Sequence, residues 1–153
     1  MQELRTLSLD EAQRAVEAAL AAARKVNKAI CAVVVDHNGD ILACARMDGL
    51  VGRYIKAAQR KAYTAAVFTR DTLGLRDWWK EKEAEGHQGP HDWNDPMLTT
   101  LPGGFAVVHG GQVVGGIGCS GGTFDVEGTR DVDFAEAALG ALGSGFSHRS
   151  GWS

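Results

Sequence analysis

Val-Val-Gly-Gly-Ile-Gly-Cys-Ser-Gly-Gly, residues 113–122, is the most informative stretch of this chain. Its apolar residues predict a buried strand that runs into a glycine-rich turn. Glycines at positions 115, 116 and 118 give up side-chain packing and cost stability, so we expect another backbone or a ligand to come very close. The turn Ser120-Gly121-Gly122-Thr123 could direct several backbone N–H groups toward one anion. A tight turn with close strand packing explains the same pattern equally well.

Apolar periodicity predicts helices before, between and after the strands of this chain. Ser8 and Glu11 form a capping-box pattern at the start of the first helix. Asp71 stands at the N-cap position of a short third helix. The predicted helices span residues 9–27, residues 53–70, a segment from Asp71 through Lys82, and residues 131–142 with Val132, Ala135, Leu139 and Leu142 on the inner face.

Two hairpins supply the predicted strands. Asn38-Gly39 joins strands at 30–35 and 41–46, and a two-residue loop there places Leu42 on the same face as Cys31. Both faces of this hairpin are apolar, so we expect its own helices to cover one face. More helices, a subunit interface or a ligand pocket would cover the other. The second hairpin spans 105–109 and 112–119 around Gly110-Gly111, and residues 98–101 could add a short edge strand.

Composition indicates an ordinary globular protein. The 153 residues are enough for one domain with a real core, and 44% are hydrophobic and 23% charged. A net charge of −3 gives no basic surface for nucleic acid, and no apolar run predicts a membrane span or a signal peptide. Three cysteines without a C-x-x-C pattern favour reduced, buried thiols in the cytoplasm. A flexible tail, residues 144–153, is expected to follow a domain of residues 1–143, with Phe146 and Trp152 able to dock on a neighbouring subunit.

The segment from Gly86 to Pro102 is long and polar for a connection, which is typical of functional or mobile loops. His87 and His91 are four residues apart, with Asp92 and Asp95 nearby, and such a set could bind a metal ion. Gly89-Pro90 breaks the helix that would bring both rings to one face. We therefore favour a lid over a pocket and assign no metal.

Two basic residues allow both a structural and a functional interpretation. Arg46 ends a strand, where it is either solvated, paired with Asp48, or able to hold a carboxylate in a pocket. Lys61 belongs with Lys56 and Arg60 to a basic run of the kind that normally marks the wet face of a helix.

A series of short motifs follows in order along the chain: Leu7-Ser8-Leu9-Asp10-Glu11-Ala12, Val34 to Gly39, Arg46-Met47-Asp48-Gly49, Lys61 to Ala66 with Phe68, Gly103-Gly104, Gly110 to Gly118, Ser120-Gly121-Gly122 and Asp131-x-x-x-Ala135. This series resembles the GlcG/HbpS-like family, often labelled haem-binding or haem-degrading, and also the C-terminal domain of PduO-type proteins. The resemblance covers residues 6 to 143 and implies an α/β (α+β) fold of profilin-like type, with an antiparallel sheet of four to five strands flanked by helices, and homo-oligomers. Arg46, Lys61, Gly121, Gly122 and Asp131 match as pocket or scaffold candidates.

This chain departs from the family pattern in two places. The segment from Gly86 to Pro102 is unlike the short connector usual in the family, and the first helix carries no histidine, although some haem-binding relatives use one there. The second departure weakens haem as an inference from the resemblance.

Three functions remain open. The first is a cofactor-independent enzyme, of isomerase, hydratase or lyase type, that acts on a small organic acid. The second is a haem- or tetrapyrrole-binding protein, with haem as the one possible cofactor. The third is a non-catalytic accessory oligomer. For the enzyme, we expect Arg46 and Lys61 to hold the carboxylate and His87 or His91 to move a proton, in a pocket completed by Ser120, Gly121, Gly122, Trp93 and Asp95.

Overall fold

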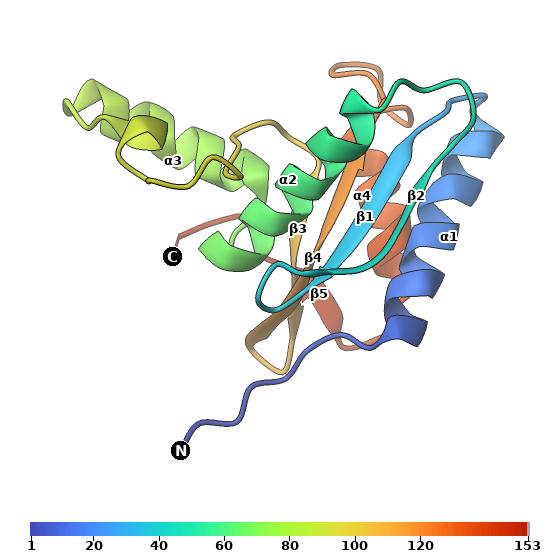
Figure 1. Cartoon of the computed structure of the whole chain (residues 1–153), viewed down its shortest axis with the longest axis horizontal. Coiled ribbons are helices and arrows are strands. Elements are labelled where there is room, and N and C mark those ends of the chain that lie inside the picture. The colour runs from blue at the N-terminus through green and yellow to red at the C-terminus, as the bar shows by residue number, and fades with distance from the viewer. Residues whose placement is uncertain (153) are drawn as a thin grey trace.

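The computed structural model describes residues 1–152 as one α+β domain built on a five-stranded antiparallel sheet in the order β2-β1-β4-β3-β5 (Figure 1). Helices α1 and α4 cover one face of this sheet, α2 covers the other, and α3 projects away from the sheet (Figure 1). The elements are α1 (Leu9–Lys25), β1 (Cys31–Asp36), β2 (Ile41–Arg46), α2 (Arg53–Phe68), α3 (Thr72–Ala84), the 3₁₀ turn η1 (Gly89–His91), β3 (Gly104–His109), β4 (Gln112–Ser120), α4 (Asp131–Gly140) and β5 (Phe146–His148).

The capping box predicted at the start of α1 is confirmed. The Ser8 N–H donates to Glu11 Oε1 at 2.8 Å, and the Glu11 N–H donates to Ser8 Oγ at 3.2 Å. Within residues 1–152, no helix is long and apolar enough to cross a membrane.

The glycines of β4 make room for α2, which is the close neighbour that the sequence predicted. A Cβ at Gly118 would lie 2.0 Å from the Ala58 carbonyl oxygen, and one at Gly116 would lie 2.2 Å from that of Ala62. Because both contacts are with helix backbone, no side chain can move aside to relieve them. The glycines therefore let α2 lie directly on the sheet, and its alanines face them.

The first hairpin has the strand register that a two-residue loop predicts, except in the pair next to its turn. Pairs from Cys31↔Arg46 to Val34↔Ala43 follow it, but Val35 pairs with Ile41 because a bulge lies beside the turn. Four residues, 37–40, separate the two strands, and Gly39 adopts a φ of +89°. The bulge moves Leu42 to the α1 side, so its predicted face is wrong. Strand β2 is also more exposed to solvent than the sequence predicted. It lies at the edge of the sheet, and Cys44 is exposed rather than buried.

The last strand comes from a segment where the sequence suggested only a loose tail. Residues 146–148 form β5 and pair with β3, from Val107↔His148 to His109↔Phe146. The expected edge strand at 98–101 is absent from the described residues. Trp152 packs on Trp78 of the same chain, with ring centroids 5.2 Å apart.

The predicted inner face of the last helix is partly wrong. Phe134 and Ala138 are fully buried together with Ala135, whereas Val132 and Leu139 are only half-buried. The cause is that α4 packs against both α1 and the sheet, so its buried face is wider than one apolar stripe.

Candidate functional site

Lys61 is buried inside the protein rather than on the wet face of its helix. Its side chain is 4% exposed, and its Nζ donates to the Cys119 carbonyl oxygen and to Asp131 Oδ2, both at 2.9 Å. The ammonium group therefore fixes α2 to the end of β4 and to the start of α4. Because the charge is already paired inside the protein, Lys61 is not placed to hold a substrate carboxylate.

The glycine-rich turn does bind an anion, but the anion is part of the chain. The Gly122 N–H donates to Asp131 Oδ1 at 2.8 Å, and the Thr123 N–H donates to the Thr129 carbonyl at 2.8 Å. Gly121 has a φ of +117°, and a Cβ there would lie 2.8 Å from the Ala29 carbonyl oxygen. The Gly122 amide that was expected to stabilise an oxyanion is thus occupied by Asp131. Ser120 lies buried at the end of β4, opposite Cys31.

The first part of the segment from Gly86 to Pro102 lies along α3 (Figure 1), whereas Pro102 at its end lines a cavity together with Thr123. His87 and His91 are exposed, and His87 Nε2 lies 3.7 Å from Glu85 Oε2. The hydrogen bonds of Lys61 and Gly122 go to Asp131 and Cys119, and neither histidine is among their partners in the described part of the chain.

Trp93 and Asp95 fasten this segment to the protein. The Trp93 ring packs between Phe68 and Trp79, at centroid distances of 5.1 and 6.2 Å. The Tyr63 hydroxyl donates a hydrogen bond to Asp95 Oδ2 at 2.5 Å, and this hydrogen bond raises the pKa of Tyr63. In the described part of the chain, no group of three His, Cys, Asp or Glu side chains could hold a metal ion.

Arg46 is exposed at the end of β2, where it lines a hollow of about 350 Å³. The other side chains around this hollow come from the end of α1 and from the turn after β2: Leu20, Arg24, Met47 and Asp48. Arg24, Arg46 and Asp48 thus line one hollow, although Arg46 Nη1 itself lies close to Gly52 at the start of α2, 3.3 Å from where a Cβ there would stand.

A second hollow, of about 400 Å³, continues along the same two elements. Val16 lines it one helical turn before Leu20, and Ala45 lines it one residue before Arg46. We call the two hollows together the α1–β2 groove. Its floor is apolar, formed by Val16, Leu20, Leu42, Ala43 and Ala45, while Gln13 and Glu17 stand at its side.

Sequence reasoning found Arg46 but missed Arg24 and the groove. The spacing of Val16, Leu20 and Arg24 along one side of α1 was available as a signal. Its meaning depends on β2 being an open edge strand, which local periodicity does not show.

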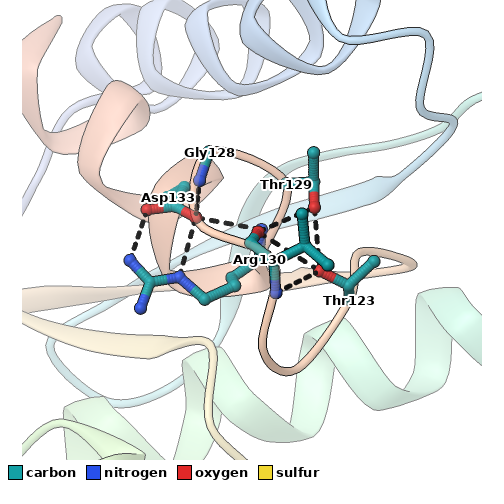
Figure 2. Close-up of polar contacts among 6 residues, drawn as sticks. Thr123, Gly128, Thr129, Arg130 and Asp133 are labelled. Carbon is teal, nitrogen blue, oxygen red and sulfur yellow. Dashed lines mark hydrogen bonds and ion pairs between the residues drawn. The ribbon is translucent and has the colours of Figure 1, made fainter.

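The loop after β4 is held by its own hydrogen bonds (Figure 2). The Arg130 guanidinium donates to both carboxylate oxygens of Asp133 at 2.9 Å, and the Gly128 N–H donates to the same carboxylate at 2.8 Å. The Thr123 and Thr129 hydroxyls lie 2.8 Å apart across the base of the loop. The hydrogen bonds from Arg130 are the main cause that lowers the pKa of Asp133. Sequence reasoning assigned no role to this network.

Comparison with known proteins agrees with this fold. The sequence model of the haem-degrading HbpS-like family matches residues 7–140. The chain belongs to this family. The predicted resemblance and the predicted antiparallel α+β fold are thereby confirmed.

Two solved structures are similar to this chain over most of its length. An HbpS double mutant from Streptomyces reticuli is 32% identical with a TM-score of 0.76, over 94% of this chain and 91% of that one. A PduOC–haem complex is 26% identical with a TM-score of 0.77, over 95% of this chain and 99% of that one. Protein GlcG of Escherichia coli K12 is 35% identical over 114 residues, which cover 74% of this chain and 81% of GlcG.

Proposed function

We propose that this chain binds haem or a closely related tetrapyrrole in the α1–β2 groove. The family description and the relative seen in complex with haem support this ligand. The observation that carries the proposal is an apolar groove that ends at two exposed arginines, Arg24 and Arg46.

The chemistry of the groove fits the two parts of a haem molecule. A tetrapyrrole ring is flat and apolar, and the groove floor offers aliphatic side chains along α1 and β2. Haem also carries two propionates, and arginine binds carboxylates through paired N–H donors. Asp48 lies at the same end, so Arg24, Arg46 and Asp48 together leave one positive charge for the ligand.

The groove offers no imidazole for the iron. Within the described residues none of its lining side chains is a histidine, and the Ile30 N–H donates to the Met47 sulfur at 3.3 Å. We therefore propose that the chain holds the ring by its face and its propionates rather than through a histidine–iron bond. Bound haem would supply an iron centre, and the exposed Cys44 thiol is the lining group that could approach it.

The enzyme hypothesis is less well supported. Lys61 and Gly122 are bonded to Asp131, whereas His91 lies along α3 and Arg46 at the end of β2. A small organic acid could not contact all of these residues at once, and no proton-transfer chemistry is assigned to them.

A cytoplasmic location and a homo-oligomer remain part of the proposal. An exposed free thiol at Cys44 suits a reducing compartment. The open edge of β2 would allow contact with a second copy.

A haemin titration followed by its absorption band tests the site. Gln13→Trp places an indole at the side of the groove and should weaken binding about tenfold or more. Ala21→Trp, on the exposed side of the same helix, is the matched control and should bind like the wild type. Equal affinity in both variants would exclude the groove as the haem site.

A further inference from the structure

A separate cavity of about 250 Å³ lies between the first turns of α3 and the loop that follows β4. It shares no lining residue with the α1–β2 groove. Its walls come from four parts of the chain that are distant in sequence: Leu73 and Arg76 of α3, Pro102, the loop residues Thr123 and Phe124, and Arg130 with the first residues of α4.

The loop that forms one wall is rigid in its hydrogen bonding yet presents a large apolar side chain to solvent. Thr123 and Thr129 close its base, and Asp133 accepts from the Gly128 and Arg130 backbone N–H groups (Figure 2). Phe124, next to this network, is 83% exposed. A fixed loop that exposes an aromatic ring beside a cavity is typical of a binding surface.

Asp131, the acidic residue among those that line this cavity, is already neutralised by the chain. Asp131 is paired with Lys61 at 2.9 Å, and Asp133 with Arg130 at 2.9 Å. Neither carboxylate is therefore free to attract a cationic ligand.

Arg76 is the cation of the cavity with the weakest partner. Among residues 1–152 its ion-pair partner is Asp77, its sequence neighbour, at 3.4 Å. The Arg76 side chain is 37% exposed and that of Asp77 62%, so this long contact is well solvated and worth little. Most of the N–H donors of Arg76 thus remain available at the rim.

The geometry points to a binding site for a small monocarboxylate with an apolar body, whose carboxylate pairs with Arg76 and whose body lies against Leu73, Pro102 and Phe124. The small volume favours ligands of the size of benzoate or hexanoate over larger molecules. This site shares no residue with the proposed haem site, so either proposal can be wrong without affecting the other.

A titration of the ¹⁵N-labelled full chain with benzoate, followed by NMR, tests the site. We expect saturable shifts at the amides of Arg76, Phe124 and Val132. Arg76→Gln should weaken binding about tenfold, the loss expected for one charge-assisted interaction. Arg14→Gln, an exposed arginine on α1 that does not line the cavity, is the matched control and should leave the affinity unchanged.

Two further measurements decide between charge recognition and non-specific apolar contact. Benzamide has the same ring without the charge, so it should bind clearly more weakly than benzoate, and Phe124→Ser should weaken both ligands. The proposal is overturned if benzoate causes no saturable shifts at these amides. It is overturned equally if Arg76→Gln binds benzoate like the wild type, or if benzamide binds as tightly as benzoate.

Discussion

Lys61 and Asp131, 70 residues apart in sequence, form a buried ion pair with an Nζ–Oδ2 distance of 2.9 Å. The same carboxylate accepts the Gly122 N–H, so one side chain fastens α2, the turn after β4 and the start of α4 together. Residues that a sequence argument assigns to a substrate pocket are here the junction of three elements.

Breaking this pair should destabilise the protein strongly. Lys61→Met leaves the Asp131 carboxylate without its cation, and we expect a loss of about 3 kcal/mol in the free energy of unfolding. Lys82→Met removes an exposed pair with Glu85 and should cost less than about 1 kcal/mol. Urea denaturation of both variants measures the difference. Similar losses would show that the buried pair has no special role.

The contact between β4 and α2 should tolerate no side chain at Gly118. Gly118→Ala would place a Cβ 2.0 Å from the Ala58 carbonyl oxygen, and we expect at least about 2 kcal/mol of destabilisation or a failure to fold. Gly140→Ala is the control, because a Cβ there meets no atom within 4 Å. That change should be neutral or stabilising by up to about 1 kcal/mol. Equal stability of the two variants would contradict the packing described for α2.

Most helices and strands of this fold can be predicted because their signals lie within a few neighbouring residues. The capping box of α1 and the glycines of β4 each depend on a few neighbouring residues, and their predictions are confirmed. The β1–β2 bulge and strand β5 could not be predicted in the same way. The first depends on how the turn relaxes, and the second on Phe146–His148 finding the free edge of β3.

The contact between His148 and Asp71 should make stability depend on pH. Asp71, at the N-cap position of α3, does not cap the helix through its side chain. Its carboxylate instead pairs with His148 Nδ1 and accepts the Ala106 N–H. The hydrogen bond to Asp71 is the largest cause that raises the pKa of His148, with a smaller contribution from Glu136 on α4, while burial opposes it.

The pKa of His148 is higher in the folded protein than in the unfolded chain, where it is about 6.5. The stabilisation that the His148–Asp71 pair adds to the free energy of unfolding is therefore complete below the unfolded pKa, and it is lost as the pH rises through the folded pKa. His148→Gln should therefore lower the free energy of unfolding more at about pH 6 than at about pH 9. Urea denaturation at both pH values measures this. His91→Gln, an exposed histidine of η1, should show no such dependence. An equal loss for His148→Gln at both pH values would argue against the pairing.

Binding in the α1–β2 groove should not require iron. No histidine is among its lining residues within the described chain, and under the proposal we expect the ring face and the propionates to supply most of the affinity. Protoporphyrin IX should bind within about threefold of haemin, a difference below 1 kcal/mol. Quenching of tryptophan fluorescence measures both ligands under the same conditions. A large preference for haemin would indicate that an iron ligand contributes to the affinity, and the exposed thiol of Cys44 is the lining group to test for that role.

The candidate sites were harder to predict than the fold. Arg46 was found because it ends a strand, but Arg24 and Arg76 lie on helices among other charged residues, where sequence alone does not mark them. Lys61 shows the reverse case, since its charge suggested solvent and the structure buries it against Asp131. Whether such a charged side chain is buried or lines a site depends on how elements distant in the sequence pack together.

The most direct test of the haem proposal is the affinity of an Arg24→Ala/Arg46→Ala double variant for haemin. Loss of both propionate partners should weaken binding by at least about tenfold, while the melting temperature stays close to that of the wild type because both side chains are exposed. Arg14→Ala, on the same helix but outside the groove, should bind haemin like the wild type. If the double variant binds haemin as tightly as the wild type, the α1–β2 groove is not the site.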